Sequence, residues 1–95
     1  MPQTLLITGC SEGGIGDALA QEFHTRGLRV FATARNLNKL KHLETVGIET
    51  VSLDVTDEES IRKAVEKIKL ATEGTLDFLV NNAGLGELLF FNWPF

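Results

Sequence analysis

The residues most able to do chemistry in this 95-residue sequence form a glycine-rich segment near its start, Thr8-Gly9-Cys10-Ser11-Glu12-Gly13-Gly14-Ile15-Gly16. Glycines permit tight backbone turns and leave no side chain between the chain and a ligand. Where a helix follows such a segment, its free amides and the positive end of its dipole can bind phosphate. The segment therefore predicts a cradle for the pyrophosphate of a dinucleotide; a glycine-rich loop without a ligand is the alternative.

A second informative position follows residues 28–34. In dinucleotide-binding folds an acidic side chain there binds the ribose 2′-hydroxyl of NAD. This sequence instead has Arg35, with Lys39 and Lys41 nearby. A guanidinium pairs well with the 2′-phosphate of NADP, so the sequence favours NADP over NAD. Glu12 argues in the other direction because its carboxylate would repel a phosphate, and Arg35 as a solvated residue is the alternative.

Polar residues also follow the next two predicted strands. Asp54 could accept a hydrogen bond from the adenine amino group, and Val55 could pack against the ring; alternatively, Asp54 helps to cap the next helix. In the segment Asn81-Asn82-Ala83-Gly84 the amides could bridge neighbouring strands, while Ala83 and Gly84 would let a ribose approach the backbone. An ordinary strand-end turn explains this segment equally well.

The remaining reactive side chains indicate neither a nucleophile nor a metal site. Cys10 has no identifiable partner base, and His24 and His42 are expected on the surface of helices, away from the glycine segment. Asp17 is expected in the first turn of a helix, where a negative charge is favourable. A single cysteine cannot form an internal disulfide, which suits a reducing compartment and predicts a cytoplasmic location.

Alternating strands and helices are predicted to position these residues. Apolar and β-branched runs predict strands at residues 4–8, 28–34, 48–53 and 76–80. Asn36 and a capping box with Thr56 and Glu59 predict the starts of the second and third helices. Helical spacing predicts buried faces formed by Ile15, Ala18, Leu19 and Phe23, by Leu37, Leu40 and Leu43, and by Ile61, Ala64, Val65 and Ile68.

The strand and helix order predicts the α/β class, with a Rossmann-like doubly wound parallel sheet. The sequence provides only its N-terminal portion, about four strands and three helices. We expect a partial NAD(P)-binding Rossmann domain over residues 1–86 and a divergent aromatic tail over residues 87–95.

The glycine segment, Asp54 and Asn81-Asn82-Ala83-Gly84 resemble, in order and spacing, the short-chain dehydrogenase/reductase family over residues 4 to about 86. The segment Leu-Leu-Ile-Thr-Gly-Cys-Ser-Glu-Gly-Gly-Ile-Gly is most similar to the corresponding segment of fungal NADPH-dependent 1-acyldihydroxyacetone-phosphate reductases. The resemblance implies hydride transfer between NADPH and a carbonyl or alcohol, and for these reductases lipid metabolism and an association with the endoplasmic reticulum or lipid droplets. The loop departs from the family pattern by one extra residue after Gly9.

The resemblance also implies roles for individual residues. It implies Ser11 and Arg35 near the adenosine ribose and its phosphate, and Asp54 at the adenine. Asn81 would lie at the ribose beside the nicotinamide. The residues that it implies at the pyrophosphate are Gly9, Gly14, Ile15 and Gly16.

Catalysis is not assigned to any residue of this sequence. The family's catalytic serine, tyrosine, lysine and supporting asparagine are expected after residue 95, and the sequence contains no tyrosine. A carbonyl substrate is therefore expected only for a full-length relative, and whether this chain is an enzyme stays open. A net charge of −4 argues against nucleic acid as a partner, and no apolar stretch is long enough to span a membrane.

The strand at residues 76–80 is expected to have one bare edge, which predicts self-association. The tail with Phe90, Phe91, Trp93 and Phe95 would either fold back over the exposed sheet or have no evolved role. Three hypotheses stay open: a truncated reductase product that binds the cofactor, an inactive nucleotide-binding or interaction module that pairs with a full-length relative, and an enzyme with an unrelated catalytic residue such as Cys10.

Overall fold

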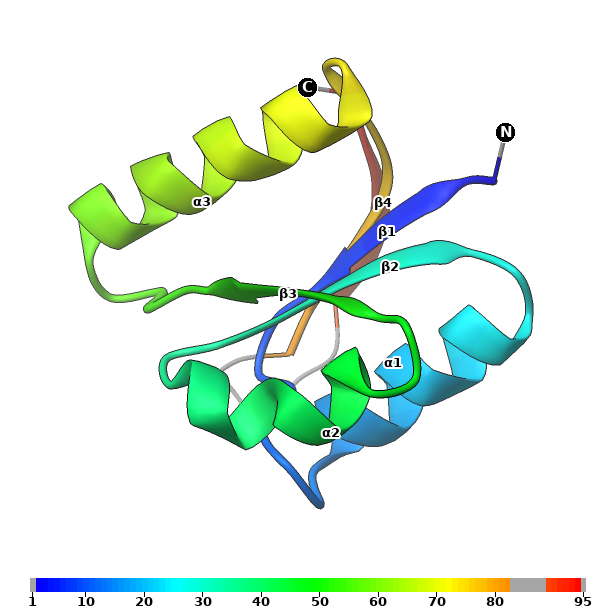
Figure 1. The fold of residues 1–95 in the computed structure, drawn as a ribbon. Helices are drawn as coiled ribbons and strands as arrows, with labels where there is room; N and C mark the ends of the chain where they lie inside the picture. The colour runs from blue at the N-terminus through cyan, green and yellow to red at the C-terminus, as the bar shows by residue number, and fades with distance from the viewer. Residues whose placement is uncertain (1, 83–88, 95) are drawn as a thin grey trace.

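One twisted sheet with helices on both faces is the framework of the computed structural model, which describes residues 2–82 and the backbone of residues 89–94 (Figure 1). The strand order is β3-β2-β1-β4-β5. Strands β1 to β4 are mutually parallel, as predicted, whereas β5 runs antiparallel to β4. The strands are β1 (Thr4–Ile7), β2 (Arg29–Ala34), β3 (Glu49–Ser52), β4 (Thr75–Asn81) and β5 (Leu89–Pro94).

The helices divide between the two faces of the sheet. Helices α1 (Ile15–Thr25) and α2 (Lys41–Glu44) cover one face, and α3 (Glu58–Thr72) crosses the other (Figure 1). A 3₁₀ turn, η1 (Leu37–Leu40), leads directly into α2. Asn36 caps η1, because its side chain accepts a hydrogen bond from the amide of Asn38. The predicted second helix is therefore real but split into two short segments.

The core has two layers because side chains of a strand alternate between its faces. Leu5 and Ile7 of β1 point to the layer under α1 and α2, which also contains Leu40 and Leu43. Leu6 points to the layer under α3. The other buried members of that second layer are Phe31, Val51, Ala64, Ile68 and Leu76. Burial on both faces explains why these strands read as continuous apolar runs.

All three predicted helix faces are partly wrong. On the second face Leu40 and Leu43 are buried, but Leu37 is 42% exposed. In α1 the fully buried positions are Gly16, Asp17 and Ala20, while Ile15 is 63% exposed. In α3 Ala64 and Ile68 are buried as predicted, but Ile61 and Val65 are 38% and 40% exposed. In both helices small residues form part of the buried contact, while Ile15, Ile61 and Val65 lie at its margin.

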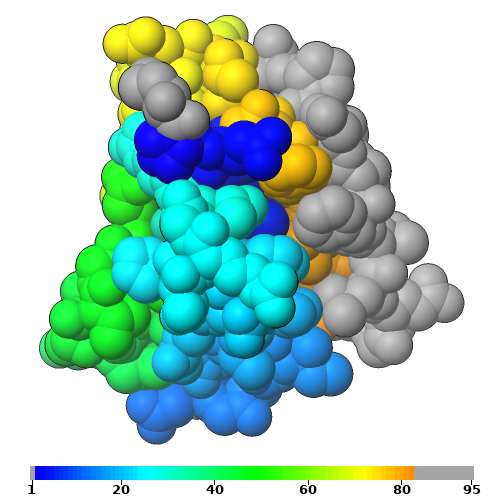
Figure 2. All heavy atoms as spheres, turned by 90° about the vertical axis from the view of Figure 1, so that its right-hand side faces the viewer, coloured from blue at the N-terminus to red at the C-terminus, as the bar shows by residue number. Residues whose placement is uncertain are grey.

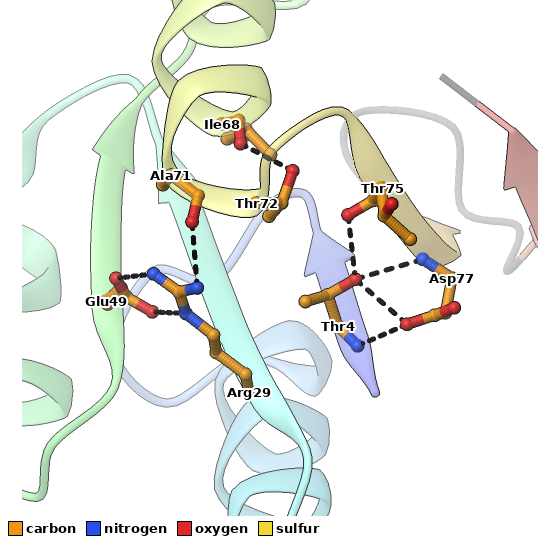
Figure 3. Close-up of polar contacts among 8 residues, drawn as sticks. All are labelled: Thr4, Arg29, Glu49, Ile68, Ala71, Thr72, Thr75 and Asp77. Atoms are coloured by element: carbon orange, nitrogen blue, oxygen red, sulfur yellow. Dashed lines mark hydrogen bonds and ion pairs between the residues drawn. The ribbon is translucent and has the colours of Figure 1, made fainter. Parts of the chain in front are cut away.

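The edge of the sheet at which β1 begins is fastened by polar contacts (Figure 3). Figure 2 shows the start of β1, in dark blue, beside the yellow end of α3 and the orange β4. The guanidinium of Arg29 donates two hydrogen bonds to the carboxylate of Glu49, at 2.7 and 2.8 Å, and a third to the carbonyl of Ala71 at 2.9 Å. This pairing lowers the pKa of Glu49. Thr4 and Asp77 bond each other across β1 and β4, with the amide of Thr4 donating to Asp77 at 2.8 Å. This end joins the strands to α3.

The prediction of a bare edge on β4 is wrong. The backbone of β5 pairs with β4 from Asn81↔Leu89 to Thr75↔Pro94, with a register irregularity between Thr75 and Phe78. The tail segment therefore folds back beside β4 as a strand, because an unpaired strand edge offers it free donors and acceptors. Self-association remains a prediction, but a bare β4 edge no longer supports it. No helix within the described residues is long and apolar enough to cross a membrane.

Candidate functional site

The predicted cofactor residues that lie in the described part of the chain gather where β1 to β4 end. Parallel strands bring their carboxyl ends to the same edge, and the order reverses between β1 and β4, which is where doubly wound folds bind ligands. The loops that follow β1, β2 and β3 meet there. The opposite edge carries the Arg29 and Thr4 contacts described above.

The glycine segment forms a tight loop between β1 and α1. Gly9 and Gly13 have φ of 71° and 84°, values that side chains with a Cβ rarely adopt. The amide of Cys10 donates to the carbonyl of Thr33 at 2.9 Å, which ties the loop to β2. The amide of Gly14 donates to the carbonyl of Ser11 at 3.1 Å and closes the turn that leads into α1. The extra residue of the loop is thus accommodated by a turn with defined hydrogen bonds.

Gly16 sits where the start of α1 passes close to the loop. A Cβ at this position would lie 2.3 Å from the carbonyl oxygen of Gly9 and 2.9 Å from the side-chain amide nitrogen of Asn82. Real Cβ atoms do not approach backbone oxygens so closely, so any other residue would force the helix away from the strand. Glycine is therefore needed at this position for packing, in addition to any contact with a ligand.

The N-terminus of α1 presents amide groups to this edge of the sheet. Gly14 is the N-cap residue and makes no side-chain cap. Within the described residues the amides of Ile15 and Gly16 have no hydrogen-bond acceptor, as expected for the first turn of a helix. Ile15 begins the helix with its side chain largely exposed. Unpaired donors at a helix N-terminus are suited to a phosphate group.

A cavity of about 320 Å³ lies beside the glycine loop. Its walls come from the loops after β1, β2 and β3, which are separated by about 20 residues each in the sequence. Predicted cofactor residues from all three loops line it: Gly9, Ser11, Arg35, Asp54 and Val55. Ala34, Leu53 and Thr56 complete the lining. The cavity therefore combines apolar walls with one cationic and one anionic side chain.

The side chain of Asp54, in the loop after β3, is held in a defined orientation. Its Oδ1 accepts hydrogen bonds from the hydroxyl and the amide of Thr56, at 2.6 and 3.0 Å. These bonds, assisted by the charge of Arg35, lower the pKa of Asp54, so its carboxylate is ionised at neutral pH. Within the described residues Oδ2 accepts no hydrogen bond. Asp54 therefore keeps an acceptor for a ligand.

The predicted capping box is wrong in its details. Asp57, not Thr56, is the N-cap residue of α3, and its side chain accepts a hydrogen bond from the amide of Glu59 at 3.0 Å. Thr56 is occupied by Asp54 instead. Asp54 is not the N-cap of α3, but it contacts the first turn of this helix, because its backbone amide donates to the hydroxyl of Ser60 at 2.8 Å. Thr56 does not cap the helix because its amide and its hydroxyl both donate to Oδ1 of Asp54.

The end of β4 is tied to the glycine loop. The side-chain amide of Asn82 donates to the carbonyl of Gly9 at 3.2 Å, and its backbone amide donates to the hydroxyl of Thr8 at 2.9 Å. That hydroxyl in turn donates to Oδ1 of Asn81 at 3.3 Å. The predicted bridging by short amides is thus confirmed. Ala83 and Gly84, which were predicted to admit a ribose, lie outside the described residues.

Cys10 does not have the properties of a nucleophile. Its side chain is fully buried, and the thiol donates to the carbonyl of Ile7 at 3.4 Å. Burial raises the pKa of Cys10 to about 12, so the reactive thiolate is essentially absent at neutral pH. The hypothesis of an enzyme that uses Cys10 as its catalytic residue therefore finds no support here.

Sequence reasoning missed a buried carboxylate and its partners. Asp17 is only 7% exposed; its Oδ2 accepts the amide of Gly13 at 2.9 Å, and its Oδ1 lies 2.8 Å from Nε2 of His42. Burial alone would raise the pKa of Asp17, but hydrogen bonds from Gly13, Gln21 and His42 outweigh it and lower that pKa. His42 is thus a hydrogen-bond partner of Asp17 in the loop region and not a plain surface residue. No spacing motif links positions 17 and 42, so only the folded chain reveals the pair.

Comparisons with known proteins agree with this geometry. The model of the family described as short chain dehydrogenase matches residues 3–92. Short-chain dehydrogenase PC-15 of Penicillium crustosum is 58% identical over 88 residues, which are 92% of this chain and 32% of that protein. The NADPH-dependent 1-acyldihydroxyacetone phosphate reductase of Schizosaccharomyces pombe is 51% identical over 80 residues, 84% of this chain and 27% of that protein.

A solved structure is similar over the same region. The crystal structure of a short-chain dehydrogenase from Streptomyces avermitilis matches with a TM-score of 0.76 and 40% identity, covering 88% of this chain and 31% of that one. This chain thus spans about a third of the length of the relatives that it matches.

Proposed function

This chain belongs to the short-chain dehydrogenase family, and we propose that the carboxyl edge of its sheet holds the adenosine half of NADP(H). Members of the family are oxidoreductases that bind a nicotinamide dinucleotide. The observation that carries the proposal is the cavity formed by the loops after β1, β2 and β3, in which Ser11, Arg35 and Asp54 come together. A nucleoside with a charged substituent suits this combination of apolar walls and charged groups.

The adenine would occupy the part of the cavity next to the loop after β3. Asp54 has a fixed carboxylate with an available oxygen, which can accept a hydrogen bond from the exocyclic amino group of adenine. Val55 is 40% exposed and offers an apolar surface on which the ring can pack. This assignment gives a reason for an exposed apolar side chain beside an oriented carboxylate.

The 2′-phosphate would lie between Ser11 and Arg35. Both residues line the cavity, one from the glycine loop and the other from the end of β2. A guanidinium binds phosphate through two parallel hydrogen bonds, and a serine hydroxyl adds a third donor. The end of β2 has no carboxylate that would repel the phosphate. NADP is for these reasons our choice over NAD.

The pyrophosphate and the nicotinamide ribose would lie along the glycine loop toward β4. The unpaired amides of Ile15 and Gly16, with the open backbone at Gly9 and Gly14, can donate to phosphate oxygens. Asn81 would contact the ribose beside the nicotinamide, because its side chain ends β4 next to the loop. Ala83 and Gly84 keep their proposed role in this contact.

The nicotinamide supplies the hydride when the cofactor is bound. The residues described here bind and orient the cofactor, and none is proposed to transfer a proton. We propose that the full-length form of this protein reduces a carbonyl group with NADPH. The likeness to the Schizosaccharomyces pombe reductase supports a 1-acyldihydroxyacetone phosphate as a substrate. A cytoplasmic location, including the surface of the endoplasmic reticulum or lipid droplets, is proposed because the only cysteine is buried and unpaired.

Titration of the purified chain with NADPH and NADH, followed by nicotinamide fluorescence, tests this function. We expect saturable binding of NADPH that is tighter than binding of NADH and that raises the melting temperature. A folded chain that binds neither cofactor would refute the proposal. Equal affinity for both would refute the assignment of the 2′-phosphate site.

A further inference from the structure

Two carboxylates, one in the glycine loop and one in α1, lie close to where a pyrophosphate would bind, and both face the ring of His42. Asp17 belongs to α1 and is buried, whereas the side chain of Glu12 is 74% exposed in the loop. His42 reaches them from α2, with Nε2 2.8 Å from Oδ1 of Asp17 and Nδ1 3.6 Å from Oε2 of Glu12. The ring is thus placed between two acidic groups that come from different elements.

The two contacts of His42 depend differently on its proton. A neutral imidazole has one N–H donor and one acceptor nitrogen, whereas an imidazolium has two donors. The shorter contact with Asp17 favours the proton on Nε2 in the neutral ring. Nδ1 would then present a lone pair to the carboxylate of Glu12, and this contact would be repulsive. Only the protonated ring can attract both carboxylates at once.

The position of Glu12 matters for phosphate binding. Glu12 lines a shallow hollow together with Ser11, Asn38 and Lys39, and this hollow adjoins the larger cavity at Ser11. A carboxylate released from His42 can turn within the hollow toward the groups that Ser11 would bind. Because like charges repel, a free Glu12 would weaken the binding of an anionic ligand.

We propose that His42 is a positioning residue which, while protonated, keeps Glu12 away from the cofactor phosphates, so that affinity for NADP(H) falls as His42 loses its proton. The inference rests on the proposed function for its ligand. Within the described residues the charged groups that contact the ring are Asp17 and Glu12, and the charged neighbours on η1 and α2 are Lys39, Lys41 and Glu44. Asp17 remains fixed through Gly13 and Gln21 in either state.

The binding test compares four forms of the chain at about pH 6 and about pH 8, a range over which histidine usually titrates. The forms are the wild type, Glu12→Gln, His42→Gln and His24→Gln. The last is a matched control, because His24 lies near the other end of α1. The phosphates of NADPH titrate alike in all four experiments, so each dissociation constant is divided by that of the His24→Gln control at the same pH.

We expect the wild type and the His24→Gln control to have the same dissociation constant for NADPH at each pH value. Relative to the control, Glu12→Gln should bind NADPH about threefold more tightly at the higher pH, the size of a weak exposed ion pair. His42→Gln should bind about threefold more weakly at the lower pH, because Glu12 is then free at any pH. Identical ratios for all four forms would overturn the inference while leaving the proposed function intact.

A ligand-free measurement separates the inference from the proposed function. The ring resonances of His42 are followed by NMR through a pH titration in the wild type and in Glu12→Gln. Loss of the Glu12 charge should move the midpoint of the His42 titration to lower pH and leave that of His24 unchanged. An unmoved His42 midpoint would show that Glu12 and His42 do not interact and would overturn the inference, whether or not NADPH binds.

Discussion

The side-chain amide of Asn82 donates a hydrogen bond of 3.2 Å to the carbonyl of Gly9, 73 residues earlier in the chain. The contact joins the end of β4 to the first glycine of the loop, next to the point where Gly16 passes closest to both residues. The end of β4 and the glycine segment, which are distant in sequence, therefore determine each other's positions at the edge where we propose that the cofactor binds.

Replacement of Asn82 should disturb this edge. Asn82→Ala removes the donor to Gly9, and we expect a loss of about 1 kcal/mol in the free energy of unfolding, with weaker binding of NADPH. Asn82→Asp keeps the shape but places a carboxylate against a carbonyl oxygen, so its loss should be larger. Urea unfolding of the wild type, Asn82→Ala and Asn82→Asp measures the loss in free energy of unfolding for each variant. Wild-type stability of Asn82→Asp would contradict the role of this hydrogen bond.

The two glycines at the start of α1 should respond differently to an added methyl group. Gly16→Ala places a Cβ 2.3 Å from the carbonyl oxygen of Gly9, whereas Gly14→Ala places one 3.3 Å from that of Ser11. We expect Gly16→Ala to lower the free energy of unfolding by about 1–3 kcal/mol, as overpacking does. Gly14→Ala should cost less. Thermal melts of both variants test the order, and equal losses would contradict the close approach at Gly16.

The Asp17 carboxylate should stabilise the chain at neutral pH but not in acid. Its pKa is lower in the folded chain than in the unfolded chain, so its contribution is present above about pH 4 and is lost as pH falls through the folded pKa. Asp17→Asn should therefore cost about 1–3 kcal/mol at pH 7 and clearly less at about pH 3. Glu66→Gln, an exposed carboxylate on α3, is the control and should change little. A pH-independent loss in Asp17→Asn would argue against the ionised buried carboxylate.

The Cys10 thiol should destabilise the fold in alkaline solution. Its pKa is about 12 in the folded chain, because the side chain is buried. An unfolded cysteine ionises near pH 8.5, so between about pH 9 and pH 12 stability should fall by up to about 1.4 kcal/mol per pH unit. Cys10→Ala should lack this component of the alkaline slope. Parallel slopes for the two forms, or rapid native reaction with a thiol reagent at neutral pH, would contradict the burial of Cys10.

Much of the fold follows from local sequence patterns. The apolar runs predicted the positions of β1 to β4, and their alternation with helices predicted a parallel sheet, which the structure shows with the order β3-β2-β1-β4. The pattern could not predict that residues 89–94 pair with β4, because strand pairing of a tail depends on which edge is free in the folded chain. Local patterns also misplaced the cap of α3, since Thr56 has two competing partners, Asp54 and the helix.

The candidate site was predictable where backbone geometry defines it. Gly9, Arg35 and Asp54 follow successive parallel strands, so their meeting at one edge follows from the topology. The burial of Asp17 does not follow from the topology. It depends on how closely α1 approaches the sheet at Gly16, which is determined by packing and not by the helix alone. Once Asp17 is buried, His42 becomes its hydrogen-bond partner across 25 residues.

The central claim is that the cavity beside Arg35 binds adenosine with a 2′-phosphate. Calorimetric titration with adenosine 2′,5′-bisphosphate and with adenosine 5′-phosphate tests it most directly, because these probes carry only the half of the cofactor that the cavity would hold. We predict that the bisphosphate binds at least about tenfold more tightly to the wild type, as expected for a charge-assisted pair. Arg35→Asp should abolish this difference, whereas Arg26→Asp, at the far end of α1, should preserve it. Equal binding of the two probes by the wild type, or a preference that survives Arg35→Asp, would contradict the claim.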